Sequence, residues 1–220
     1  MTALDRVAEM LAGTAVDPRV AMVWSASPGH QADIVTSILV ELPHAIKTHP
    51  DQLVLLEVMN PFGIAQRRDI DLNTILAEDP ELGQEKLESI KEEVASNILK
   101  GLDAGAHGVL YRLDGAYPRA NTPMQYGGYY LEHDRELLSL AEGSTFNCVN
   151  IEGEGEIYFD FVSDLPTHAF SWSTVHNHIS LEEARKMTPT KLALGLKDAD
   201  IHLARNFDEI ERLRERLATT

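Results

Sequence analysis

The chain of 220 residues is 44% apolar and 25% charged, a composition typical of one globular domain with a sizeable buried core. It carries 35 acidic and 19 basic side chains, which give a net charge of −16 at pH 7. Such a field repels phosphate backbones and anionic lipid, so we expect neither nucleic acid nor a membrane surface among its partners.

Three sequence features favour the cytoplasm. Apolar runs such as Leu53–Leu56 fall far short of the roughly 18 residues that a membrane-spanning helix needs. The N-terminal Met1–Leu11 is amphipathic and acidic, without the basic region and apolar core of a secretory signal. The single cysteine, Cys148, excludes an internal disulfide and favours a reducing compartment. We therefore predict a cytoplasmic protein that forms a single domain over residues 1–220.

Short apolar runs alternate along the chain with segments of helical periodicity. Strands are predicted near Val20–Trp24, Leu53–Met59, Gly108–Leu113, Thr145–Asn150, Ala169–Trp172, Lys191–Leu196 and Asp200–Leu203. Helices are predicted near Ala32–Ala45, Gln84–Ala104, Tyr126–Ala141, Leu181–Met187 and Phe207–Leu217. In the helix over Gln84–Ala104, apolar residues from Leu87 to Leu102 share one face, and Gly105 ends the helix.

This alternation predicts a parallel sheet that is covered by helices and built through right-handed crossovers. The pattern fits either a doubly wound sheet or a (β/α) barrel. In both architectures ligands bind beyond the carboxyl ends of the strands. Functional residues are therefore expected directly after each predicted strand.

Polar residues follow the second and third predicted strands. Asn60 stands in the turn after Leu53–Met59, and Arg112 and Asp114 stand two residues apart at the end of the next strand. Strand alternation places Arg112 and Asp114 on the same side, where they suit the orientation of a substrate. A local ion pair between the two is the alternative interpretation.

The segment from Asn150 to Glu156 is the richest in polar groups. If the chain stays extended, Asn150, Glu152 and Glu154 point the same way, and the intervening glycines let the backbone approach a ligand. Acids this close repel one another, so we expect at least one raised pKa or a bound cation. Either outcome suits acid–base catalysis or metal binding, and a solvated acidic loop is the alternative.

Trp172 ends the strand predicted at Ala169–Trp172, and His176 and His178 follow in the next loop. Two histidines with this spacing can bind a metal, but no third ligand stands at a recognised spacing, so polar surface is the alternative. The sequence has no Gly-x-Gly-x-x-Gly, Gly-x-Ser-x-Gly or Cys-x-x-Cys motif and no phosphate-binding loop. Dinucleotide binding, nucleotide hydrolysis and serine-hydrolase chemistry are therefore disfavoured.

A set of short segments stands in an order typical of a known family: Arg6–Gly13 with Asp17–Val20, Val58–Gly63, Gly105–Tyr111, Phe159–Pro166, Ala169–Trp172 and Ser180–Arg185. They resemble motifs of the uroporphyrinogen decarboxylase-like superfamily, which also includes corrinoid- and zinc-dependent methyltransferases. The resemblance is best between Glu78 and Leu196. It implies an eight-stranded (β/α) barrel with its site at the carboxyl ends of the strands.

The chain departs from this family in two ways. It lacks a strand–helix unit between Gly63 and Glu78, so the predicted α/β fold is a shortened (β/α) TIM-like barrel without a complete set of eight βα units. Where methyltransferase relatives carry His-x-Cys zinc ligands, this chain has Asn150-Ile151-Glu152, which suits zinc poorly but tolerates a harder divalent cation. Glu152 and Glu154 also repel a polycarboxylate, so porphyrinogen decarboxylation is disfavoured.

The leading hypothesis is an enzyme of this superfamily, of decarboxylase or lyase type or a methyl-group transferase, acting on a small organic substrate. Its predicted catalytic residues are Glu152, Glu154 and Asp114, its predicted substrate contacts are Asn60, Arg112, Asn150, Trp172 and His176, and no residue is assigned to a metal.

Two alternatives remain open. A reduced, non-catalytic member would act as a binding or partner subunit, because an incomplete barrel exposes apolar strand edges that a partner or a second copy covers. A methyltransferase with an altered metal site would hold a divalent metal as its cofactor. Under each hypothesis we expect a homo-oligomer or a partner subunit.

Overall fold

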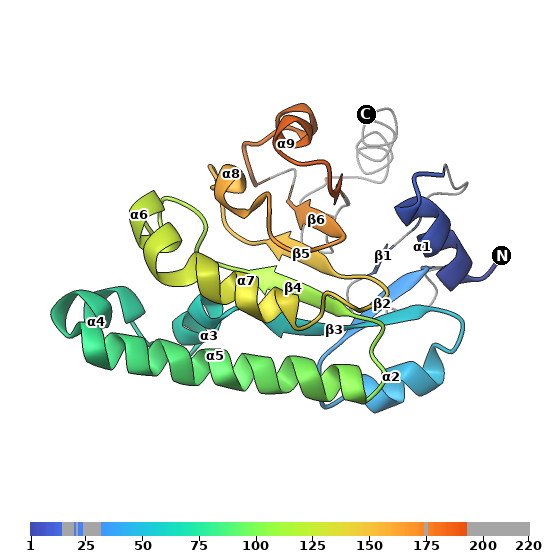
Figure 1. The fold of residues 1–220 in the computed structure, drawn as a ribbon, viewed down its shortest axis with the longest axis horizontal. Helices are drawn as coiled ribbons and strands as arrows, with labels where there is room; N and C mark the ends of the chain where they lie inside the picture. The colour runs from blue at the N-terminus through green and yellow to red at the C-terminus, as the bar shows by residue number, and fades with distance from the viewer. Residues whose placement is uncertain (15–19, 21, 24–31, 174–175, 193–220) are drawn as a thin grey trace, which may run out of the picture.

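Seven parallel strands form one sheet, and the order of the strands across the sheet follows their order along the chain (Figure 1). A computed structural model describes residues 1–14, 20, 22–23, 32–173 and 176–192. The strands are β1 (Met22–Val23), β2 (Ile34–Ser37), β3 (Leu53–Met59), β4 (Val109–Leu113), β5 (Cys148–Ile151), β6 (Ala169–Trp172) and β7 (Lys191–Leu192). The predicted α/β fold with a parallel sheet is thus confirmed.

Helices occupy most of the connections between the strands. They are α1 (Ala3–Leu11), α2 (Leu42–Thr48), α3 (Pro61–Arg67), α4 (Leu72–Glu78), α5 (Pro80–Asp103), α6 (Pro123–Gln125), the π-helix η1 (Tyr126–Tyr130), α7 (Leu131–Ser139), α8 (Phe159–Val162) and α9 (Leu181–Met187). Among the described residues, no helix combines the length and the apolar character that crossing a membrane requires.

The bounds predicted for β3, β6 and α9 agree with the structure, but the single helix predicted over Ala32–Ala45 is wrong. That segment holds β2 and only then the start of α2. Ile34, Val35 and Thr36 are β-branched, buried and paired with β3, whereas Pro43 stands in the first turn of α2. Four buried strand residues followed closely by a helix produce an apolar pattern that resembles one helix.

Other predictions fall partly or wholly outside the described residues. The strand predicted at Lys191–Leu196 begins as β7, but only its first two residues are described. The strand predicted at Asp200–Leu203 and the helix predicted at Phe207–Leu217 lie beyond the described part of the chain.

The segment between β3 and β4 contains α3, α4 and α5 but no strand, and β3 pairs directly with β4. This arrangement is consistent with a shortened barrel. Closure of a barrel would require β7 to pair with β1, and the pairing in the described part of the chain runs from β1 to β7 without that contact.

Helix α5 lies along one side of the sheet with α7 beside it (Figure 1). Asp79 caps its first turn by accepting a hydrogen bond from the Leu82 N–H, and Gly105, with a φ of +100°, follows its end. The side chains of Leu87, Ile90, Val94 and Ile98 are buried, as the helical periodicity predicts.

Glycine lets this helix approach the sheet closely. A Cβ atom at Gly101 would lie 2.5 Å from Cδ2 of Leu56 on β3. Leu56 is fully buried at this contact. Burial of such a leucine side chain stabilises the fold by roughly 1.5–3 kcal/mol.

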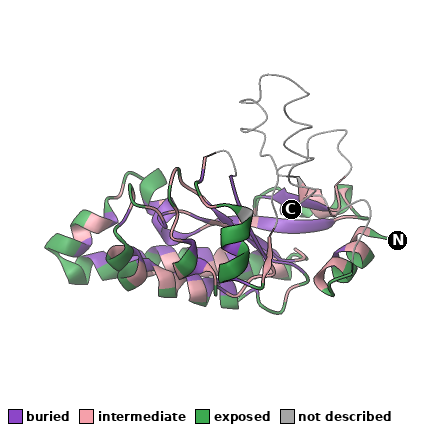
Figure 2. Cartoon of the chain, turned by 90° about the horizontal axis from the view of Figure 1, so that it is seen from above, coloured by how far each residue is buried: buried purple, intermediate pink, exposed green. Residues whose placement is uncertain are grey.

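The two faces of the sheet bury different sets of side chains. On the face covered by α5 and α7, called the outer face, Val54, Leu56, Tyr111 and Val149 join the larger apolar cluster. On the opposite, inner face a smaller cluster gathers near the amino ends of the strands, and Val7 of α1 packs into it: Ile34, Leu53, Leu55, Leu110, Phe146, Cys148 and Ala169. Figure 2 shows that the strands are largely buried, whereas the helices have buried and exposed faces.

The helix predicted over Tyr126–Ala141 begins as a π-helical turn, η1, and continues as the α-helix α7. Tyr126, Tyr130 and Asp134 are buried at intervals of four residues along it. Gly127 lies against the ring of Phe161, and a Cβ atom there would be 3.0 Å from that ring. Turns of this kind are rare and often accompany functional sites.

Candidate functional site

A row of polar side chains lies on the inner face near the carboxyl ends of the strands. The β4–β5 register aligns Arg112 with Asn150, and the β5–β6 register aligns Asn150 with Ser171. Each of these residues is two positions after an apolar residue of the inner cluster, so strand alternation directs them to the same face. The apolar layer is thus followed by a polar layer at the end where such sheets bind ligands.

Arg112 is at the centre of a charged network that we call the inner polar cluster, formed by Glu57, Arg112, Asn150 and Glu152. Its Nη1 donates to Oε1 of Glu57 at 2.9 Å, and its Nε donates to Oε1 of Glu152 at 3.0 Å. Nδ2 of Asn150 donates to the same Glu152 oxygen at 2.7 Å. The three charged side chains are 21–23% exposed, so the cluster is partly buried but still accessible to solvent.

The charge of Arg112 is secured by these contacts. Burial alone would lower the pKa of the guanidinium, but the charges of Glu152 and Glu57 and their hydrogen bonds outweigh burial and raise the pKa. Arg112 therefore stays protonated at any physiological pH, and it holds Glu57 and Glu152 on either side of itself.

Asp114 stands at the mouth of this cluster, one residue after β4. Its Oδ1 accepts a hydrogen bond from the Gly115 N–H at 2.7 Å. Burial raises the pKa of Asp114, against smaller lowering effects from the hydrogen bonds of Gly115 and Tyr117, and the charges of Glu152 and Arg112 contribute less and in opposite directions. Asp114, which lies outside the acidic segment Asn150–Glu156, therefore retains a proton more readily than an exposed aspartate, mainly because it is buried.

Asn60 holds the loop that carries Asp114. It is fully buried and caps α3, because its Oδ1 accepts from the Gly63 N–H at 3.0 Å. The same oxygen accepts from the Asp114 N–H at 3.1 Å, and Nδ2 donates to the Asp114 carbonyl oxygen at 2.9 Å. These hydrogen bonds join two loops, and the predicted contact of Asn60 with substrate stays a prediction.

A second group of polar side chains, which we call the outer polar cluster, lies between α7 and the sheet. It consists of Asp134 on α7 and its hydrogen-bond partners Tyr111, Tyr126 and Asn60. Asp134 is fully buried and accepts from the hydroxyl of Tyr111 at 2.7 Å and from that of Tyr126 at 2.9 Å. Nδ2 of Asn60 approaches it at 3.4 Å. Burial raises the pKa of Asp134 to about 7, although the hydrogen bonds from Tyr111, Tyr126 and Asn60 act in the opposite direction.

Glu154 does not join Glu152. Gly153, with a φ of +120°, interrupts the extended backbone, and the Glu154 side chain is 68% exposed. It forms an ion pair with Arg119 at 3.4 Å on the surface. The prediction that Asn150, Glu152 and Glu154 point the same way therefore holds for the first two residues and fails at Glu154, because alternation requires a continuous strand.

Trp172 lies on the outer face of β6, away from the inner polar cluster. Its ring is fully buried and meets the ring of Phe159 edge-on, with the centroids 5.4 Å apart. The prediction that Trp172 contacts substrate is corrected accordingly, because this side chain belongs to the apolar core. Adjacent Ser171 is the residue of this strand that faces the cluster.

His176 supports the rim through its backbone. Its carbonyl oxygen accepts from the Gly155 N–H at 2.8 Å, and its N–H donates to Oγ of Ser173 at 3.3 Å. Asn177 next to it donates to the Gly153 carbonyl oxygen at 3.1 Å. The loop after β6 thus holds the glycine segment that follows Glu152.

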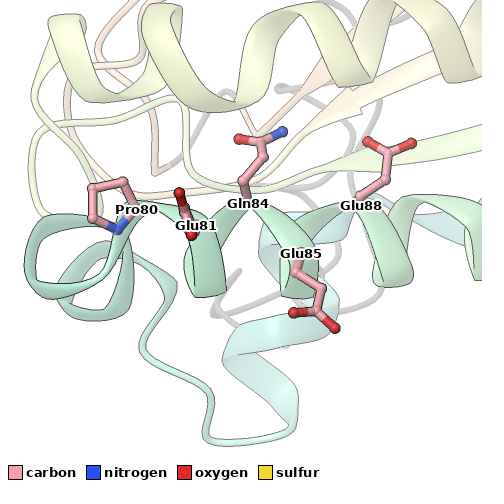
Figure 3. A pocket seen from close by; sticks show the side chains of 5 residues that line it. All are labelled: Pro80, Glu81, Gln84, Glu85 and Glu88. Carbon is pink, nitrogen blue, oxygen red and sulfur yellow. The ribbon is translucent and has the colours of Figure 1, made fainter.

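Two depressions in the surface lie outside the inner polar cluster. One, of about 570 Å³, lies at the rim between α3, α4 and the loop after β4, and is lined by Phe62, Gln66, Asp69, Ile70, Asp71, Asn73, Thr74, Tyr117, Arg119 and Ala120. The other, also about 570 Å³, follows α5 alone and is lined by Pro80, Glu81, Gln84, Glu85 and Glu88 (Figure 3). The first shares Tyr117 with the surroundings of Asp114, whereas the second is an open helix surface.

A divalent metal is among the cofactors that the sequence allows. In the described part of the chain, no three histidine, cysteine, aspartate or glutamate residues are grouped as metal binding requires. A divalent cofactor therefore stays a prediction, and the described residues supply no ligand set for it.

Sequence reasoning missed Glu57, which pairs with Arg112. The only available signal was its position as the one acid in the apolar run Leu53–Met59. Charged residues are rarely buried in a strand unless they are paired, so that position was informative. The partner could not be identified without the register between β3 and β4.

No family model matches the chain, and no curated protein matches its sequence. Among solved structures, its fold is similar to that of a methyltransferase from Methanosarcina mazei, with a TM-score of 0.60 and 14% sequence identity. The match covers 71% of this chain and 46% of that one, so this chain spans less than half of the structure that it matches. At this identity the likeness shows a shared fold alone, and membership of the uroporphyrinogen decarboxylase-like superfamily stays a prediction.

Proposed function

We propose that the chain is a methyltransferase-like enzyme that binds a small organic substrate at the inner polar cluster. The observation that carries this proposal is the network of Arg112, Glu57, Glu152 and Asn150 at the carboxyl ends of the strands. Barrel enzymes assemble their sites at that end, and the fold neighbour is named as a methyltransferase. A decarboxylase or lyase reaction has no comparable support.

The proposed roles follow from position and charge. Arg112 is fixed by its two carboxylate partners and orients the substrate. Glu152 lies at the rim and accepts the proton of the group that is methylated. Asp114, whose pKa is raised, donates a proton to the group that loses its methyl. The bond from the donor atom to the methyl carbon breaks as the bond to the acceptor forms, so one proton is taken up and one is released.

The residue roles are tested with a matched pair of variants, Glu152→Gln and Glu154→Gln. The assay offers isotope-labelled methylamine, methanol and dimethyl sulfide as donors and 2-mercaptoethanol as acceptor, and NMR detects the S-methyl product. We expect Glu152→Gln to lower the rate by roughly 100-fold or more, as loss of a general base does. Glu154→Gln should stay within about threefold of the original chain, since its side chain is largely exposed.

Two results would count against the proposal. Equal rates for the original chain and Glu152→Gln would remove Glu152 from the reaction. No transfer from any of the three donors would remove methyl transfer itself, and leave the inner polar cluster as a binding site.

A second function, that of a binding or partner subunit, is favoured by one observation. In the described part of the chain β1 and β7 have two residues each, and each pairs with a single neighbouring strand. Edges of this kind are covered by a partner or by a second copy when they are apolar. Size-exclusion chromatography with light scattering should then give a mass above 24.4 kDa, and a monomer at all concentrations would contradict assembly.

A further inference from the structure

The inner polar cluster contains a buried hydrogen-bond acceptor that has no donor. Asn150 is fully buried, and its Oδ1 atom has no partner in the described structure. The amide cannot resolve this by rotating through half a turn, because Oδ1 would then face the Glu152 oxygen that now accepts from Nδ2 at 2.7 Å. A buried acceptor without a donor is unfavourable, so a donor that the described residues do not supply is expected.

The same cluster is rich in negative charge. Glu57 and Glu152 contribute two carboxyl groups, Asp114 adds a third at the mouth of the cluster, and among the described residues Arg112 is the cation that bonds to the first two. Lys191 is on the inner face as well, but it pairs with Ala169 and is therefore one layer nearer the amino ends than Asn150. An anionic ligand would add to the repulsion between the carboxylates, whereas a cationic ligand would relieve it.

We propose that the inner polar cluster binds the protonated amino group of a small organic amine. This inference rests on the site assigned under the proposed function and specifies the substrate class for it. An ammonium group provides N–H donors for Oδ1 of Asn150 and a positive charge for Glu57 and Glu152. An alcohol provides the donor without the charge, and a quaternary ammonium provides the charge without the donor.

A bare metal ion fits these residues less well than an amine does. Hard divalent cations take six or more oxygen ligands. Glu57 and Glu152 each already use one oxygen to bind Arg112, whose positive charge would lie next to the ion. An ammonium group can instead use Oδ1 of Asn150 and the second oxygen of Glu57 without displacing the guanidinium.

Four probes of similar size separate charge from hydrogen bonding: propylammonium, tetramethylammonium, 1-propanol and propionate. Their binding to the full chain is measured by ligand-observed NMR titration at pH 7.5 and low salt. Ligands of four or five heavy atoms are expected to bind in the millimolar range. Propylammonium should bind roughly 10-fold more tightly than 1-propanol or propionate, and tetramethylammonium should bind less tightly than propylammonium.

Matched variants locate the binding site. Glu57→Gln removes one charge and preserves the shape of the side chain, so it should weaken propylammonium binding by roughly 10-fold. Glu85→Gln makes the same change in net charge on the exposed surface of α5, where Glu85 points away from Gln84 and Glu88 (Figure 3), and should alter binding less than about twofold. Asn150→Leu should weaken the binding of propylammonium more than that of tetramethylammonium, with circular dichroism reporting on folding.

The outcomes distinguish this inference from the proposed function. If propionate or 1-propanol binds more tightly than propylammonium, and Glu57→Gln alters that binding, the site stands and the amine inference is wrong. If Glu57→Gln and Glu85→Gln behave alike with all four probes, neither the amine nor the site assignment survives.

Discussion

Two neighbouring residues of β4 serve two polar clusters with opposite properties. Tyr111 points to the outer face and donates to Asp134, and Arg112 points to the inner face and binds Glu57 and Glu152. In the outer cluster both carboxylate oxygens of Asp134 accept hydrogen bonds, and no part of the side chain reaches solvent. The inner cluster is partly exposed, carries excess negative charge and leaves Asn150 Oδ1 without a donor.

This difference indicates how a polar cluster that stabilises the fold can be distinguished from one that binds a ligand. A buried group whose hydrogen bonds are complete makes the structure rigid, and its removal lowers the free energy of unfolding. A group that lacks a hydrogen-bond donor and lies among charges of the same sign can bind a ligand, and its removal lowers the affinity for that ligand. The predictions below test whether the two clusters of this chain divide in that way.

The largest effect is expected from Asp134→Ala. The substitution leaves the buried hydroxyls of Tyr111 and Tyr126 without their acceptor and opens a cavity, so the free energy of unfolding should fall by about 3–5 kcal/mol. Urea denaturation followed by circular dichroism measures the loss. Asp160→Ala, at an exposed position in α8, is the control. A loss below about 1 kcal/mol in Asp134→Ala would mean that the outer cluster does not hold the fold together.

The next effect concerns pH. The pKa of Asp134 is about 7 in the folded chain and 3.8 as its ordinary value, so between these pH values the folded chain keeps a proton that the unfolded chain releases. The stabilisation from that proton is complete below pH about 4 and is lost as the pH rises to about 7, by up to ~1.4 kcal/mol per pH unit.

The unfolding free energy should therefore decline between pH 5 and 7 more steeply in the original chain than in Asp134→Asn, which cannot titrate there. Denaturant titrations of both chains at several pH values give the difference, and other titrating groups cancel in the subtraction. Parallel curves would show that Asp134 is not the group that carries this pH dependence.

A smaller loss of stability is expected from Arg112→Met. Glu57 and Glu152 would lose their shared cation, but they are partly exposed, so the free energy of unfolding should fall by about 1–3 kcal/mol. Adding Glu57→Gln should restore part of that loss, because it removes one of the repelling charges. Urea denaturation of the single and double variants tests this, and additive losses would argue against a shared network.

The smallest effect is expected from Glu154→Gln. Its ion pair with Arg119 spans 3.4 Å, and both side chains are largely exposed. The unfolding free energy should change by less than about 0.5 kcal/mol. A larger change would give Glu154 a structural role that its surroundings do not explain.

The sequence predicted those elements whose hydrophobic pattern is clear and is bounded by turn residues. Leu53–Met59 is a long apolar run between turn residues, and its bounds agree with β3. The helix predicted over Ala32–Ala45 failed because β2 is short and buried on both faces, so its residues do not alternate in polarity. The short α3, α4 and α8 have too few turns to produce a clear periodicity.

The sequence predicted only those site residues whose positions follow from the order of the strands and the alternation of side chains along them. Arg112, Asn150 and Glu152 lie together because they are at the carboxyl ends of two adjacent parallel strands, which the sequence indicates. Glu57 lies within its strand, and its pairing depends on the register between strands. Trp172 was misplaced because a strand buried on both faces does not reveal which face is the inner one.

The π turn at Tyr126–Tyr130 places a constraint on insertions and deletions. A regular α-helix advances about 40° beyond one full turn in four residues, and the wider π turn compensates for part of that drift between Tyr126 and Asp134. Loss of one residue here, such as Gly128, would reduce the separation of Tyr126 and Asp134 to seven residues, which in a regular α-helix falls only about 20° short of two turns and keeps both side chains on one face. We therefore expect homologues that keep the outer polar cluster to have either this π turn or a regular α-helix that is one residue shorter.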